Sequence, residues 1–192
     1  MGFLDTLLGR TRPVPPDLDR LFGLPSAAVT LEAAAGFTAT GVGSVCFSSV
    51  EGAEFSRIQE EVRELLAADE QRTGPPVGSE RDAFGYSWLV SHRDADDLPA
   101  LVGDLHAVNS ALEESGFGPQ LLCSLVGFRD PGGRRLGLVY LYKRGTFYPF
   151  APVAADRRDN ALELQVRGVL TDDLRIEPDL SRWFALWGAP GL

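Results

Sequence analysis

Residues 120–144 read "QLLCSLVGFRDPGGRRLGLVYLYKR" and give the clearest structural signal in the chain. Two apolar runs are joined by Asp-Pro-Gly-Gly, in which proline presets one turn angle and glycine supplies a positive one. Both runs carry apolar residues on both faces, which is typical of strands that are covered on both sides. The stretch therefore predicts a central β-hairpin.

Two other segments have the composition of strands. Residues 37–50 hold β-branched and aromatic residues around Gly41 and Gly43, as expected for one strand or a hairpin. Residues 82–92 alternate large and small side chains with the two-residue period of a strand. The large side chains that we expect on its covered face are Phe84, Tyr86, Trp88 and Val90.

Apolar residues recur at helical spacing in three segments, residues 53–69, 98–112 and 156–170. The second helix is expected to be capped by Asp96 or Asp97 and to stop at Gly116. The third is expected to begin after Asp156 or Asp159, with Glu163 and Arg167 placed to form an ion pair.

Residues 17–36 predict a short helix capped by Asp17, a break at Gly23 to Pro25 and an alanine-rich helix that begins at Ser26. A strand around Val29 is the alternative interpretation of the last part.

The order of these elements indicates an α+β fold in which an antiparallel sheet is covered by helices. Apart from the helix at 53–69, the succession is similar to that of YbjN-like and secretion-chaperone-like domains. At 192 residues, the chain is long enough for one hydrophobic core. We expect a single domain over residues 17–192, preceded by an arm and proline-rich linker over residues 1–16.

The arm carries four apolar residues at helical spacing before three prolines break the pattern. It can be a short helix that packs on the domain, a partner-binding helix or a weak foot at a membrane surface. The apolar residues concerned are Phe3, Leu4, Leu7 and Leu8.

A net charge of −9 opposes binding to nucleic acid or to anionic lipid. The chain has no apolar stretch long enough to span a bilayer and no signal-peptide pattern. We expect a cytoplasmic protein with at most peripheral contact with the inner face of the membrane. Cys46 and Cys123 lie in separate strand-like runs and are expected to be small core residues of a reducing compartment.

The sequence contains no recognisable catalytic, metal or cofactor motif. Its two histidines and two cysteines lack the short spacings of zinc ligands, and its glycines complete no phosphate-binding pattern. We expect no catalytic residues, no metal and no cofactor. The alternative is a small hydrolase or nucleotide-binding enzyme whose polar residues meet only in the fold.

The segment "YLYKRGTFYPFAP", residues 140–152, places aromatic rings beside two cations. Three rings offer roughly 450 to 750 Å², whereas the largest apolar patch of a typical monomer is roughly 300 to 600 Å². They must therefore either fold beneath the sheet and the C-terminal tryptophans, Trp183 and Trp187, or belong to an interface. The candidate interface residues are Lys143, Arg144, Phe147, Tyr148 and Phe150.

Several long strings resemble the PspA-associated PspAB family of actinobacteria. They are "MGFLDTLLGR", "LHAVNSALEESGFGPQLLCSLVGFRD", "LVYLYKRGTFYPFAP", "RRDNALELQVRGVL" and "WGAPGL". The resemblance implies a place near a PspA-type membrane-stress protein, in the phage-shock context and often beside an HtpX-type protease, but it implies no reaction. We therefore expect a non-catalytic adaptor that binds a PspA-type coiled-coil protein, or a related envelope-stress component, through the arm and the aromatic-basic segment.

Overall fold

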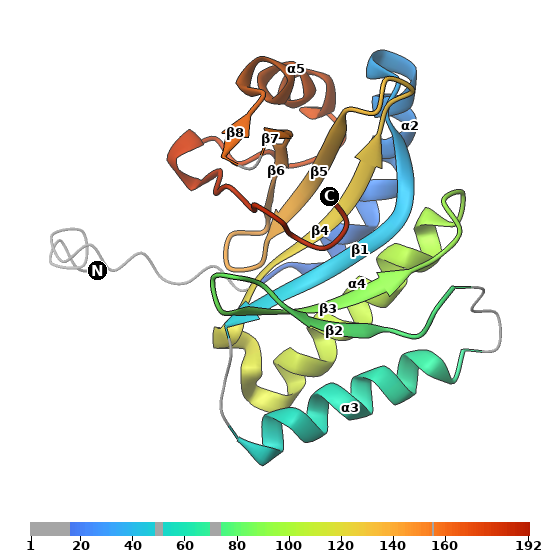
Figure 1. The fold of residues 1–192 in the computed structure, drawn as a ribbon, viewed down its shortest axis with the longest axis vertical. Coiled ribbons are helices and arrows are strands. Elements are labelled where there is room, and N and C mark those ends of the chain that lie inside the picture. Colours follow the sequence, from blue (N-terminus) through green and yellow to red (C-terminus); the bar gives the residue numbers. More distant parts are fainter. Residues whose placement is uncertain (1–15, 49–51, 70–73, 155) are drawn as a thin grey trace, which may run out of the picture.

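The computed structural model describes residues 16–48, 52–69, 74–154 and 156–192. A six-stranded antiparallel sheet in the order β2-β3-β1-β4-β5-β6 forms its centre (Figure 1). The strands are β1 (Thr38–Ser48), β2 (Gly78–Arg81), β3 (Tyr86–His92), β4 (Leu121–Arg129), β5 (Arg135–Leu141) and β6 (Thr146–Phe150). The short strands β7 (Pro152–Ala154) and β8 (Arg157–Arg158) pair separately. The predicted α+β class is confirmed.

The predicted hairpin is also confirmed, because β4 and β5 pair from Cys123–Leu141 to Arg129–Arg135. Asp130 fixes the turn between them by accepting a hydrogen bond from the Arg134 amide at 2.7 Å. The next turn, at the end of β5, uses Gly145 with φ of 62°, a conformation that favours glycine.

The described part of residues 37–50 forms one long strand, β1, and not a hairpin. The pairing of β1 with β4 shifts register between Ala39 and Gly43, and Gly41 within this irregularity has φ of 76°. A side chain at Gly41 would collide with the carbonyl oxygen of Arg93. The glycines that suggested a turn therefore bend the strand without reversing it.

The helices contribute the larger of two cores. Their bounds are α2 (Leu24–Ala35), α3 (Ala53–Ala67), α4 (Leu98–Leu112) and α5 (Asn160–Leu170), with a 3₁₀ turn, η1, over Leu18–Gly23. In Figure 1, α2 and α4 lie behind the sheet, and α4 contacts β1, β3 and β4. Helix α3 packs on α4, whereas α5 contacts α2 and β6.

Two contacts hold the helical layer in place. On α4, the buried Asp104 carboxylate binds the guanidinium of Arg93 at 2.7 Å and accepts a hydrogen bond from Ser91 at 2.6 Å. On α3, the ring of Phe55 lies edge-on to Phe47 of β1, with ring centroids 5.3 Å apart. Such aromatic contacts add specificity to simple burial.

Several helix predictions need correction. Residues 26–35 are helical, so the strand alternative is wrong. Gly23 to Pro25 do not separate two helices, because η1 ends at Gly23 and α2 begins at Leu24. Pro25 lies in the first turn of α2. Backbone N–H groups in the first turn have no partner within the helix, so a proline there costs no hydrogen bond. Glu163 forms its ion pair with Arg158 at 2.9 Å and not with Arg167.

Two of the predicted helix caps form, whereas Asp17 precedes η1 without a capping hydrogen bond from its side chain. The Asp97 carboxylate accepts a hydrogen bond from the Ala100 amide, and Asp159 accepts one from Leu162. After α4, a π-helical turn, η2 (Glu113–Phe117), contains Gly116 with φ of 85°, and a 3₁₀ turn, η3 (Gly118–Gln120), leads into β4.

The C-terminal segment covers the opposite face of the sheet and crosses in front of it in Figure 1. A short 3₁₀ turn, η4 (Leu180–Arg182), precedes the buried Trp183. Close to the C-terminus, Ser44 of β1 donates a hydrogen bond to the Pro190 carbonyl at 2.9 Å. The second core lies between this segment and the sheet.

The edge of the sheet at β6 is covered by the same part of the chain. Phe147 donates to the Arg175 carbonyl at 2.9 Å, and Glu177 donates to the Phe147 carbonyl at 2.7 Å. Residues 175–177 thus satisfy backbone groups that an edge strand would leave unpaired. No helix in the described part of the chain is long and apolar enough to cross a membrane.

Candidate functional site

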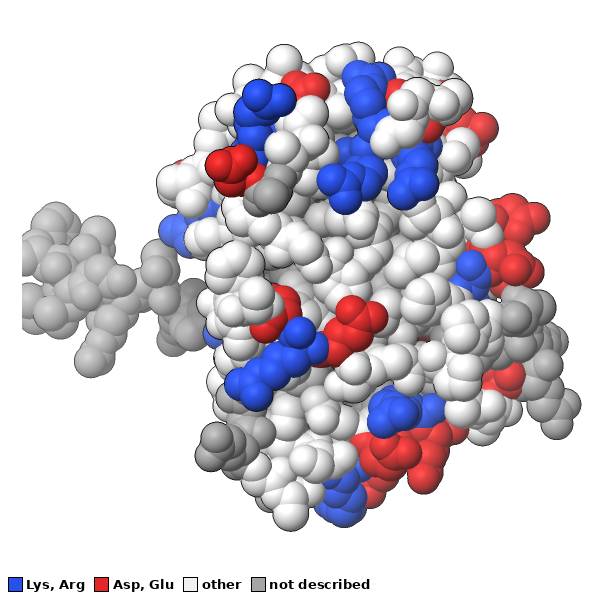
Figure 2. Space-filling model, in the orientation of Figure 1, with Lys and Arg blue, Asp and Glu red and all other residues white. Residues whose placement is uncertain are grey.

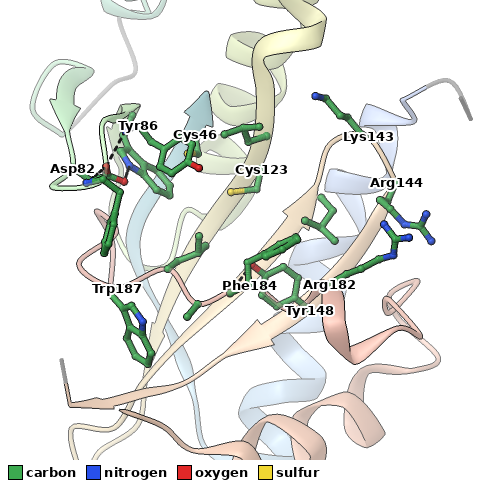
Figure 3. A pocket seen from close by; sticks show the side chains of 16 residues that line it. Cys46, Asp82, Tyr86, Cys123, Lys143, Arg144, Tyr148, Arg182, Phe184 and Trp187 are labelled. Atoms are coloured by element: carbon green, nitrogen blue, oxygen red, sulfur yellow. Dashed lines mark hydrogen bonds between the residues drawn. The ribbon is translucent and has the colours of Figure 1, made fainter. Parts of the chain in front are cut away.

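A groove of about 720 Å³ opens on the sheet face that carries the C-terminal segment. Strands β1, β4, β5 and β6 supply its floor, with the side chains of Cys46, Cys123, Leu141 and Tyr148. The tip of the β2–β3 hairpin supplies one wall, and Arg182 with residues 184–187 supplies the other. In Figure 3, Asp82 and Tyr86 lie at one side of this groove, and Lys143, Arg144 and Arg182 lie at the other.

Asp82 shapes the hairpin wall. One carboxylate oxygen accepts hydrogen bonds from the Phe84 and Tyr86 amides, both at 2.9 Å. The second oxygen accepts the indole N–H of the buried Trp88 at 3.0 Å. The turn is thereby fixed with two aromatic side chains left largely in solvent, since Phe84 is 67% exposed and Tyr86 is 44% exposed.

Hydrogen bonds also fix the opposite wall. The Tyr148 hydroxyl donates to the carbonyl of Phe184 at 3.0 Å, and the Arg158 guanidinium donates to the carbonyl of Trp183 at 2.7 Å. The Trp183 indole donates to the Glu177 carbonyl at 3.0 Å. The ring of Phe184 itself is 58% exposed, so this wall too presents an aromatic surface.

A buried carboxylate organises the cationic end of the groove. Glu177 is fully buried and accepts hydrogen bonds from Thr146 at 2.7 Å and from Arg144 at 3.0 Å. Burial raises the pKa of this carboxyl, but these hydrogen bonds and one from the Asp179 amide outweigh burial and hold the pKa below its usual value. Arg144 is therefore held beside the groove in a fixed position.

Lys143 is the only lysine in the chain. Its exposed side chain lies at the cationic end of the groove, and no ion pair with it is found among the described residues. The neighbouring Arg182 binds Asp179 at 3.1 Å. Lys143 is thus the cation that remains available for an acidic group of a bound molecule.

The floor brings together two residues that sequence reasoning kept apart. Cys46 of β1 and Cys123 of β4 are direct partners in the sheet, and both thiols are free and buried. The adjoining Cys123 side chain and burial both raise the pKa of the Cys46 thiol. Only strand register reveals this pairing, which no spacing in the sequence signals.

The aromatic residues predicted as interface candidates are buried. Phe147, Tyr148 and Phe150 are each at most 1% exposed, so in this fold they do not form an exposed patch. Their rings lie beneath other parts of the chain: Tyr148 stacks on Trp183 and Phe150 contacts Trp187 edge-on, as the burial alternative predicted. The cation that lies over Phe150 is Arg158, with 5.0 Å to the ring centroid.

Other candidates from the sequence have different outcomes. Lys143 and Arg144 are exposed, as an interface role requires. Phe84 and Tyr86 were expected on a covered face, but both are exposed. Of the four large side chains predicted there, only Trp88 and Val90 are buried. The arm residues Phe3, Leu4, Leu7 and Leu8 lie outside the described residues.

The lining of the groove is mainly apolar, and neither His92 nor His106 belongs to it. Within the described residues, no group of three or more histidine, cysteine or acidic side chains could hold a metal ion. Figure 2 shows an uncharged band across this face of the molecule, with charged side chains above and below it. This surface is suited to apolar contact with a partner.

Comparison with known proteins assigns the chain to a family. No curated protein and no solved structure gives a significant match. The similarity to YbjN-like domains therefore stays an expectation. The model of the family described as PspA associated protein B, PspAB, matches residues 1–191. The chain is a member of the PspAB family.

Proposed function

We propose that this PspAB chain is a non-catalytic adaptor that binds a PspA-type coiled-coil protein in the groove. The observation that carries the proposal is the set of exposed aromatic rings on both walls of a preformed apolar groove: Phe84, Tyr86 and Phe184. Solvent-exposed aromatic side chains beside a concave apolar surface are typical of protein-binding sites. The family description, PspA associated protein B, supports a PspA-type protein as the partner.

The chemistry of the groove defines what it can accept. Its apolar floor suits the apolar face of an amphipathic helix, the element that coiled-coil proteins offer. Lys143 at one end suits an acidic side chain on the same helix. Because the whole chain has a net charge of −9, this local cation favours one orientation of an acidic partner without attracting it over the entire surface.

The proposal includes a cytoplasmic location, with contact with the inner face of the membrane at most peripheral and mediated by the partner. It also assigns the arm a supporting role. Its apolar residues Phe3, Leu4, Leu7 and Leu8 would add a second contact with the partner.

Calorimetric titration with a purified PspA-type protein tests the groove. Truncation of Phe84 and Phe184 together to alanine should weaken binding at least about tenfold, because aromatic anchors carry a large share of interface energy. Phe22→Ala is the matched control, since Phe22 is also half exposed but contacts His106 on the helical side. Equal affinity of the double variant and the control would remove the groove from the proposal.

The single lysine allows a second, independent test. An amine-reactive crosslinker can attach to this chain only at Lys143 or at the N-terminal amine. Mass spectrometry of the crosslinked complex should identify a Lys143 crosslink to an acidic, amphipathic helix of the partner that also carries a lysine. Lys143→Glu should weaken binding, whereas Arg129→Glu, a charge reversal at an exposed residue outside the groove, should not.

A further inference from the structure

The only two cysteines of the chain face one another across adjacent strands. Cys46 of β1 and Cys123 of β4 are direct partners in an antiparallel ladder. Both belong to the second core and both line the groove. A small molecule in the groove can therefore contact the pair while the fold stays intact.

The register satisfies the geometric requirement for a disulfide. Directly opposed residues of antiparallel strands have Cα atoms about 4.5 to 5.5 Å apart, within the range of about 4.4 to 6.8 Å that disulfides span. The strand register shifts directly after Cys46, between this residue and Phe47. Such an irregularity increases local twist and lets the strands adjust to a covalent link.

We propose that Cys46 and Cys123 are a site of reversible oxidation, at which a small oxidant of the peroxide class converts the two thiols to an intramolecular disulfide. With hydrogen peroxide, one of the two sulfurs attacks a peroxide oxygen, the O–O bond breaks, the thiol proton passes to the leaving hydroxide, and a sulfenic acid and one water form. The other sulfur then attacks the sulfenic sulfur, so that the S–S bond forms and a second water leaves. The two thiols lose two electrons and the peroxide gains them.

Both cysteines line the groove, so either sulfur can meet the oxidant first, and the other sulfur then resolves the sulfenic acid. Reduction by a small dithiol reverses the reaction.

This inference rests on strand register and not on the adaptor role, so each can fail without the other. Its direct test is to treat the folded, reduced protein with hydrogen peroxide, quench it, and alkylate the free thiols under denaturing conditions. Mass spectrometry should show a monomer that has lost two hydrogen atoms and carries no alkyl group. If the oxidised protein is reduced before alkylation, both cysteines should carry an alkyl group. Thiols that stay alkylatable, or that only gain oxygen, would overturn the proposal.

Glutathione buffers provide a second measurement that does not depend on a variant. The folded chain holds the two sulfurs together, which stabilises the disulfide. The ratio of reduced to oxidised glutathione that reduces half of the disulfide should therefore be at least about tenfold higher for the folded chain than for the denatured chain. Cys123→Ala should block intramolecular closure and leave one alkylatable thiol, with circular dichroism confirming its fold. A disulfide that forms more readily in the denatured chain than in the folded one would contradict the inference.

Discussion

Glu177 shows how a single residue links the sheet edge to the groove. Its carboxylate binds Arg144 and Thr146, its backbone amide pairs with Phe147, and its carbonyl accepts the Trp183 indole. One buried residue thereby positions the cationic end of the groove and one of its walls. Its replacement should affect both stability and the dependence of stability on pH.

We predict that Glu177→Gln lowers the free energy of unfolding by about 1 to 3 kcal/mol. The loss stays below that of a fully buried pair, because the Arg144 side chain is 42% exposed and can be hydrated when its partner is neutral. Urea denaturation at neutral pH measures the difference. A variant as stable as the wild type would show that the ion pair contributes nothing.

The depressed pKa of Glu177 also predicts the pH profile. Its stabilising contribution is complete above the unfolded value, near 4.5, and is lost as the pH falls through the lower folded value. Stability measured from pH 6 down to pH 2 should therefore fall less steeply for Glu177→Gln than for the wild type. Asp130 and Asp179 also have lowered pKa values, so some acid sensitivity should remain in the variant.

Asp82 is the corresponding residue of the hairpin wall. We predict that Asp82→Ala costs about 1 to 3 kcal/mol, because the buried Trp88 indole N–H loses its acceptor. The two amides that share the other oxygen are exposed and can bind water, so they add little. Asp96→Ala, at an exposed position, is the control in the same denaturation experiment. Equal stability of the two variants would contradict the assigned role of Asp82.

At the scale of elements, glycines decide how closely the C-terminal segment approaches the sheet. A side chain at Gly127 of β4 would collide with the Gly191 carbonyl oxygen, and one at Gly137 of β5 would meet Leu192 at 3.0 Å. These two strand positions therefore stay open for residues 189–192. The covering of the second core depends on this absence of side chains.

We predict that Gly127→Ala destabilises the protein by about 1 to 3 kcal/mol, because the added methyl group overfills a close contact. Limited proteolysis should then cut the C-terminal segment faster than in the wild type. Gly103→Ala is the matched control: its Cβ would meet no atom within 4 Å, and alanine in a helix interior stabilises by about 0.5 to 1 kcal/mol. A wild-type cleavage rate for Gly127→Ala would contradict the role of this contact.

For the molecule as a whole, Asp17 and Leu18 join the folded domain, whereas the boundary between arm and domain at residue 16 stays a prediction. Leu18 is the first residue of the larger core, and the Tyr140 hydroxyl donates to the Asp17 carbonyl at 2.7 Å. We predict that a chain beginning at Pro16 unfolds at the wild-type temperature but binds the PspA-type partner more weakly. A lowered unfolding temperature would instead support an arm that packs on the domain.

The membrane alternative has its own outcome at this scale. Because the net charge of −9 opposes contact with anionic lipid, we predict that the full chain alone does not float with anionic vesicles. Flotation of the full chain but not of the chain beginning at Pro16 would assign the arm to the membrane surface.

Local sequence patterns were enough to predict the α+β class, the β4–β5 hairpin and the long amphipathic helices. These features depend on turn chemistry and on periods of two and 3.6 residues, which are local properties of the chain. The caps at Asp97 and Asp159 could be predicted for the same reason, since a carboxylate and the amide it accepts from are close in sequence.

The site, in contrast, depends on the packing of segments that are far apart in the chain. Whether Tyr148 lies inside and Phe84 outside depends on where the C-terminal segment crosses the sheet, and no period in the sequence records that path. The pairing of Cys46 with Cys123 depends on the register of β1 against β4, because contacts between distant segments are fixed by the packing of the whole sheet. The groove forms because these long-range contacts bring their residues to the same face of the sheet.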